Sequence, residues 1–216
     1  MLALTQGLMS LGAGGGGSDP FFANVVALLK LDASLADATG KVWTPTGTTT
    51  ITTAESRFGG ASLEMTSSGA NRIDCSSTDF NFGTDPYTIE GWFRPDAVTN
   101  RAFFSFGSRL VYTASGLWAY FNGSTNAITG GSVNVAVFNH VVLQRRPGGS
   151  TELIVNGALI GSPFSENVAI NPGTMRLGFY NSGNPAGRFY DEFRVTRGVA
   201  RYTAPFSPPT APFPTS

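Results

Sequence analysis

The stretch RFYDEFRVTRGVARYTAPFSPPTAPFP, residues 188–214, decides how this chain closes its fold. Residues 189–196 are typical of a last strand, and residues 198–202 of a short turn. Five prolines follow between residues 205 and 214, where they exclude a regular helix and donate no hydrogen bond to a sheet. We therefore expect a Pro-rich C-terminal strap, residues 203–214, that lies extended over the domain and is pinned by Phe206 and Phe213.

Bulk composition fits one globular β-domain without a charge bias. The 216 residues are 41% hydrophobic and include 17 phenylalanines, and only 13% are charged, against a typical ~25%. Because the formal net charge is zero, we expect no electrostatic surface for nucleic acid or an anionic membrane. The single cysteine, Cys75, excludes an internal disulfide and a thiolate-rich zinc site, and we expect it to be buried.

Residues 1–18 differ in character from the globular domain expected over residues 19–216. Residues 1–11 form an apolar arm, and residues 12–18 are a glycine-rich hinge. The first positive side chain is Lys30, which disfavours a secretory signal, and no apolar run reaches the ~18–20 residues of a membrane span. The arm is either a disordered tail or an anchor that orders on docking. Its apolar side chains favour docking, and they are Leu2, Leu4, Leu8, Met9 and Leu11.

The domain itself divides into short β-segments separated by glycine, proline and asparagine. In the clearest strand, residues 87–94, Tyr87, Ile89 and Phe93 share one face, whereas Glu90 and Trp92 share the other. The best hairpin turns at residues 156–157, where Asn-Gly suits a type I′ turn. Further strands are expected at 25–31, 62–65, 72–74, 102–106, 110–113, 117–121, 139–145, 152–155, 158–160, 174–179 and 189–196. This pattern, which has no long helical period, predicts an all-β, two-sheet antiparallel sandwich.

Five segments carry a family resemblance: DPFFANVVALLKLD (19–32), ESRFGGASLEM (55–65), FNFGTDPYTIEGWFRP (80–95), FNHVVLQRRPGGSTELIVNGALIG (138–161) and the C-terminal residues 176–214. In this order they resemble LamG-like (concanavalin A-like lectin/glucanase) jelly-roll domains of the bacteriophage virion-protein type. The resemblance covers nearly all of residues 19–214. It implies a jelly roll, often a carbohydrate-binding or adhesive module.

The phage-type opening and ending imply a virion component made in the host cytoplasm. We expect a non-enzymatic structural protein, either a capsid decoration or a tail component, that binds other virion proteins through the arm. A homo-oligomer is implied too, and trimers are common among decoration proteins. The competing hypothesis is a carbohydrate-binding adhesin for host or environmental glycans.

No catalytic pair is visible in the sequence. Glycoside hydrolysis needs two carboxylates about 5–9.5 Å apart. Glu90 shares its strand face with no second acid, and Asp191 and Glu192 are adjacent, so a regular strand would point them to opposite faces. His140, the single histidine, lies within a strand pattern and is expected to be structural.

Two kinds of ligand are weighed, and no cofactor other than calcium is considered. The resemblance raises calcium because LamG-like domains sometimes bind it at a loop rim. The weak candidate ligands, without a dense acidic motif, are Asp74, Asp79, Asp85 and Asp191. The alternative for Asp191 is a carboxylate that accepts hydrogen bonds from backbone N–H groups.

The candidate glycan-binding residues are Trp118, Tyr120, Tyr180, Asn181 and Asn184, because sugar binding needs exposed aromatic rings beside amide side chains. The alternative is that Trp118 and Tyr120 pack in the sandwich, and that residues 180–184 form an ordinary polar turn.

Overall fold

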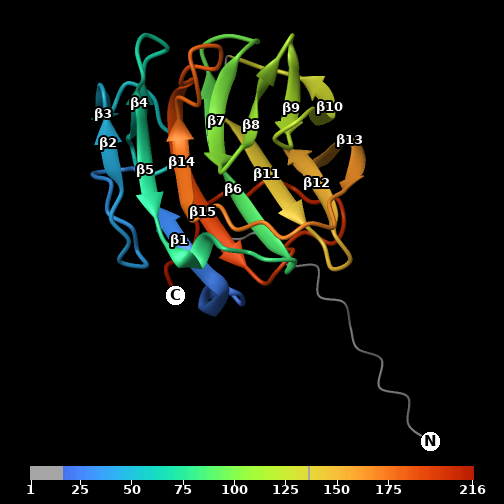
Figure 1. Cartoon of the computed structure of the whole chain (residues 1–216). Coiled ribbons are helices and arrows are strands. Elements are labelled where there is room, and N and C mark those ends of the chain that lie inside the picture. The colour runs from blue at the N-terminus through green and yellow to red at the C-terminus, as the bar shows by residue number, and fades with distance from the viewer. Residues whose placement is uncertain (1–16, 136) are drawn as a thin grey trace, which may run out of the picture.

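The structure is a computed structural model that describes residues 17–135 and 137–216, and these residues form two antiparallel sheets packed face to face (Figure 1). The fold is the predicted all-β jelly-roll sandwich. Two single-turn 3₁₀ helices, η1 (Phe22–Asn24) and η2 (Thr78–Phe80), accompany the strands. In the described part of the chain, no helix has the length and apolar character to cross a membrane.

Both sheets draw their strands from distant parts of the chain. The eight-stranded sheet has the order β13 (Ala158–Ser165), β12 (Ser150–Val155), β11 (Asn139–Arg145), β6 (Tyr87–Pro95), β15 (Arg188–Arg197), β4 (Ser62–Met65), β3 (Thr49–Thr52), and β1 (Val25–Leu29) pairs with β15 beside β4. The seven-stranded sheet has the order β10 (Asn126–Ser132), β9 (Leu117–Phe121), β8 (Arg109–Ala114), β7 (Arg101–Phe106), β14 (Thr174–Gly178), β5 (Arg72–Ser76), β2 (Thr44–Thr46).

The core lies between the sheets and is largely aromatic. Phe93 of β6 stacks on Phe103 of β7, with ring centroids 4.9 Å apart, so the two sheets interlock through their central strands. Tyr87 and Ile89 also enter the core, as the alternation along β6 predicts. Cys75 is buried with a free thiol, which confirms its expected role as a small apolar residue.

The predicted hairpin is confirmed. Strands β12 and β13 are joined by Asn156 and Gly157, both at positive φ (51° and 82°), as a type I′ turn requires.

Three strands were not predicted, namely β2, β3 and β10, and all three lie at sheet edges. An edge strand has a neighbour on one side only and is half exposed, so it does not need the apolar alternation that marks a central strand. The threonine-rich β3 and the glycine-containing β10 follow this rule, since neither carries a run of buried side chains.

The C-terminal strap crosses the outer face of the eight-stranded sheet, as expected. The N–H of Phe206 donates to the carbonyl of Gly157 at the β12–β13 turn, and the N–H of Phe213 donates to the Glu192 carboxylate of β15. Phe213 is 3% exposed, and the centre of its ring lies 4.0 Å from the guanidinium carbon of Arg194. The Phe206 ring stacks on the Tyr202 ring. The strap therefore covers part of this face, and the rest is left to form a site.

Candidate functional site

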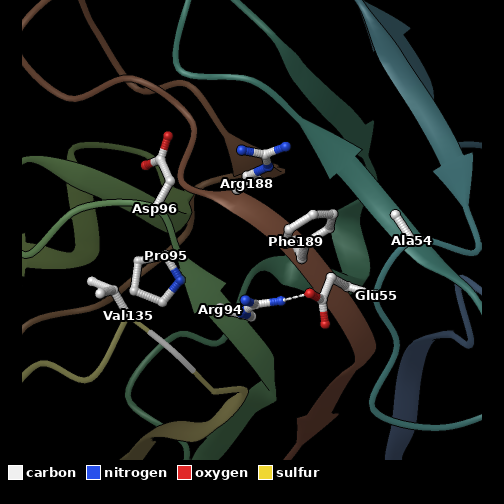
Figure 2. A pocket seen from close by; sticks show the side chains of 8 residues that line it. All are labelled: Ala54, Glu55, Arg94, Pro95, Asp96, Val135, Arg188 and Phe189. Atoms are coloured by element: carbon white, nitrogen blue, oxygen red, sulfur yellow. Dashed lines mark ion pairs between the residues drawn. The ribbon is translucent and has the colours of Figure 1, made fainter.

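An open groove of about 430 Å³ lies on the uncovered part of the eight-stranded sheet (Figure 2). The end of β6 and the start of β15 form its floor, and the loop after β3 and the loop before β11 form its walls. Arg94 and Phe189 are directly opposite each other across β6 and β15, so their side chains share one face. The lining residues are Ala54, Glu55, Arg94, Pro95, Asp96, Val135, Arg188 and Phe189.

Charged groups surround the single aromatic ring of the groove. The guanidinium carbons of Arg94 and Arg188 lie 5.6 and 5.1 Å from the centre of the Phe189 ring, within cation–π range. Arg94 pairs with Glu55, as Figure 2 shows, and Asp96 lies on the opposite side of the groove from Glu55. The groove thus offers hydrogen-bond donors and acceptors next to an apolar floor, which is the composition of a site for a polar, hydroxyl-rich ligand.

A cluster of three carboxylates lies nearby, two of them on β15 and the third, Asp32, shortly after β1. Asp32, Asp191 and Glu192 each place a carboxylate oxygen within 4.8 Å of the others. The prediction that Asp191 and Glu192 point to opposite faces is wrong, because β15 bulges between residues 191 and 194, and Glu192 takes a left-handed backbone conformation (φ 49°). The bulge turns both side chains outward. Tyr190 and Phe193, three positions apart instead of two, both enter the core, and this spacing is the sequence signal that marks the bulge.

The carboxylate cluster is short of positive charge. Asp191 Oδ2 accepts hydrogen bonds from the N–H groups of Arg57 (2.7 Å) and Phe58 (3.1 Å), and Glu192 Oε2 accepts one from Lys30 Nζ (3.1 Å). One oxygen of each acid, Asp32 Oδ1, Asp191 Oδ1 and Glu192 Oε1, is buried without a partner. Burial raises the pKa of Asp191 to about 7, and it also raises the pKa values of Asp32 and Glu192.

These residues fit a divalent cation. Three carboxylates and one ammonium group leave a formal charge of −2, and the three unpartnered oxygens are hard ligands of the kind that calcium prefers. Gly59 leaves room for the cluster, because a Cβ at this position would lie 2.0 Å from Asp32 Cγ. Of the four aspartates weighed for calcium, the structure brings only Asp191 into this cluster.

The other three aspartates are engaged elsewhere. Asp74 binds Arg72 (2.8 Å) and Arg176 (2.6 Å) on the seven-stranded sheet, so two guanidinium groups already neutralise it. Asp79 pairs with Lys41 at 2.7 Å. Asp85 is exposed, in the loop before β6. The structure therefore does not gather these three residues into one site.

The candidate glycan-binding residues also separate. Trp118 and Tyr120 are fully buried in the core, and the Tyr120 hydroxyl donates to Glu166 at 2.8 Å, so neither ring can meet a ligand at the surface. The core-packing alternative holds for these two, because β9 turns this face toward the opposite sheet. Tyr180, Asn181 and Asn184 form a surface turn in which the Tyr180 N–H donates to the Asn184 carbonyl at 3.0 Å.

Glu90 and His140, which were weighed for catalysis, are fully buried beside the strap. The Glu90 carboxylate accepts hydrogen bonds from Arg194 (2.8 and 3.0 Å), from the Tyr202 hydroxyl (2.6 Å) and from His140 Nε2 (3.1 Å). Both carboxylate oxygens are thus occupied, and these groups tie the C-terminal turn to the sheet.

The arm residues Leu2, Leu4, Leu8, Met9 and Leu11 lie outside the described residues. On the domain side of the hinge, the N–H of Asp19 donates to the carbonyl of Ser216 at 2.8 Å, which places residue 19 beside the end of the chain.

Comparison with known proteins agrees with this architecture. The family described as the concanavalin A-like lectin/glucanases superfamily (Laminin_G_3) matches residues 67–199, which is more than half of the chain. The chain belongs to this family. No curated protein matches the sequence significantly.

Three similar solved structures illustrate the fold. The binding domain of botulinum neurotoxin DC, in complex with SialylT, superposes with a TM-score of 0.65 at 13% identity over 83% of this chain and 49% of that one. Domain 4 of AbnA, an extracellular GH43 arabinanase from Geobacillus stearothermophilus in complex with arabinotriose, superposes with a TM-score of 0.63 at 16% identity, over 81% of this chain and 93% of that one. The binding domain of Paraclostridial Mosquitocidal Protein 1 superposes with a TM-score of 0.63 at 15% identity, over 83% of this chain and 50% of that one. The chain spans about half the length of the two toxin domains, and at these identities the likeness is one of fold.

Proposed function

We propose that this protein is a non-enzymatic carbohydrate-binding module and that its ligand lies in the groove between β6 and β15. The observation that carries the proposal is the arrangement around Phe189, where two arginines and two acids surround an apolar floor in an open groove. Membership of a lectin/glucanase superfamily supports the ligand class, as does the likeness to an arabinanase domain solved with arabinotriose.

A glycan array followed by calorimetry tests this proposal. Arg188→Ala removes a half-exposed side chain from the groove and should weaken glycan binding about tenfold or more, because the sugar loses a charged hydrogen-bond donor. Tyr180→Ala is the matched control at the surface turn and should bind as the unaltered protein does. The opposite result, binding lost only in Tyr180→Ala, would move the site to the residue 180–184 turn. Binding to no glycan would contradict the function itself.

Absence of catalysis is part of the proposal. The Asp32–Asp191–Glu192 cluster brings three carboxylates together, but Asp191 and Glu192 are 1% and 0% exposed, so a polysaccharide has no access to them. Release of reducing sugar from any glycan that the array identifies would contradict this part.

We further propose that calcium occupies the carboxylate cluster. When bound, it would supply the positive charge that Asp32, Asp191 and Glu192 lack. The three carboxylates would hold it, while the Arg57 and Phe58 N–H groups keep Asp191 oriented. Calcium should raise the melting temperature of the unaltered protein relative to chelator, and Asp32→Asn should abolish most of that rise. Equal melting temperatures with calcium and with chelator would refute the metal site.

A second candidate role is display of the module on a bacteriophage particle, as a capsid decoration or tail component. In this role the arm of residues 1–11 attaches the module to the particle. The sequence resemblance to phage-type openings and endings favours this role. Full-length protein and a form lacking residues 1–18 can be compared for co-sedimentation with particles that lack the protein. Binding by the full-length form alone is expected, and equal binding by both forms would contradict attachment by the arm. Analytical ultracentrifugation of the free protein tests whether it forms a homo-oligomer.

A further inference from the structure

If the groove binds glycans as proposed above, the charges that line it determine which kind of sugar it selects. Each arginine at the groove has a carboxylate partner: Arg94 pairs with Glu55, and Arg188 with Glu64 at 3.0 Å. Asp96, on the opposite wall, pairs with Arg101. The four charged residues that line the groove, two arginines and two acids, have a formal sum of zero.

This arrangement of charges should bind an anionic ligand weakly. Its carboxylate or sulfate would have to displace Glu55 from Arg94, or Glu64 from Arg188, and would leave that acid without its cation. It would also be repelled by the nearby carboxylate of Glu55, which would no longer be paired with Arg94. The residues that line the groove supply no surplus of positive charge to neutralise such a group.

Paired charges are well suited to hydroxyl groups. A hydroxyl can accept a hydrogen bond from a guanidinium N–H and donate one to the neighbouring carboxylate, so the Arg94–Glu55 pair can bind two adjacent hydroxyls at once. Phe189 is only 5% exposed and lies against both guanidinium groups, so it positions the arginines more than it offers a stacking surface.

We infer that the groove selects neutral glycans with adjacent free hydroxyls, and that it recognises them by paired hydrogen bonds and not by net charge. Binding should then change little with ionic strength, because no net charge is neutralised on binding. An acidic glycan of the same backbone should bind more weakly than the neutral one.

The experiment compares matched neutral and uronate- or sialate-bearing oligosaccharides at low and high salt. The unaltered protein should bind the neutral series, with a Kd that changes less than about twofold with salt. Glu55→Gln keeps the side-chain shape but leaves Arg94 unpaired, so it should lose about tenfold in neutral-glycan affinity and gain salt-sensitive binding of the acidic series. Asp79→Asn, at an ion pair on another part of the surface, is the control and should behave as the unaltered protein does.

Glu64→Gln frees Arg188 in the same way and serves as an independent second variant if Glu55→Gln does not fold. Preference of the unaltered protein for acidic glycans, with affinity that falls as salt rises, would overturn the inference but leave the proposed function standing. Binding to neither series would overturn both.

Discussion

Glu90→Gln is the substitution that most directly tests how the C-terminal turn and strap are held. Glu90 and Asp19 are buried acids, and between them Arg194 and Arg201 are buried bases. Asp19 accepts from Arg194 at 3.0 Å and from Arg201 at 2.8 and 2.9 Å, so two negative and two positive charges balance. The amide of glutamine keeps the shape but leaves one positive charge uncompensated. Its NH₂ group would face either the donors of Arg194 or, with the amide turned round, the Tyr202 hydroxyl and His140 Nε2.

Breaking a buried ion pair by removing one partner costs about 3–5 kcal/mol, and we expect a loss of this size in the free energy of unfolding, measured by urea denaturation. Glu64→Gln, on β4 of the same sheet, is the control, because its partner Arg188 is half exposed and the pair should contribute less than about 1 kcal/mol. If Glu90→Gln costs no more than Glu64→Gln, the buried charges do not hold the C-terminal turn, and the reasoning fails.

Three further outcomes follow from the same structure. Phe213→Ala should lower the free energy of unfolding by about 3 kcal/mol, because Phe213 is buried against Val25 and Leu28; a loss below about 1 kcal/mol would mean that the strap is not packed. Gly157→Ala should destabilise the protein more than Gly148→Ala in denaturant titrations, since both have φ near +80° but only the Cβ at 157 would lie 1.8 Å from the Phe206 carbonyl oxygen; equal costs would exclude the clash. Burial would raise the pKa of Glu90, but Arg194 and its other partners hold that pKa below its ordinary value of 4.5, so the stability it contributes is present above pH 4.5 and is lost as pH falls further. Unfolding measured between neutral and acid pH should therefore be less pH-dependent in Glu90→Gln, and an equally steep profile would contradict this.

Strand positions were readable from the sequence where the two faces of a strand differ. Along residues 87–94 the alternation placed Tyr87, Ile89 and Phe93 in the core, and the structure confirms it, because successive side chains of a strand point to opposite faces. The hairpin at Asn156–Gly157 was equally readable, since few residue pairs accept two positive φ values in succession.

The candidate sites were not readable in the same way. Asp191 and Glu192 lie on one face only because a bulge in β15 shifts the register against β6, and this shift depends on pairing between segments about 100 residues apart. Trp118 was considered for a surface site because the sequence does not distinguish an aromatic residue of the core from one of a binding site. In the structure, its position in β9 faces the opposite sheet, and the side chain is buried in the core.

Local patterns in the sequence are enough to predict the all-β class, most of the central strands, the extended strap and the family resemblance, because these depend on local periodicity, on turn residues and on the backbone limits of proline. Which acids meet, and where a ligand can enter, depends on the tertiary structure. Glu55, Arg94 and Arg188 are far apart in the chain and become neighbours through the pairing of β6 with β15 and the course of the loop after β3. A charge at one position acquires its partner from the whole fold, since Coulombic and hydrogen-bond energies depend on distance in space and not on separation along the chain.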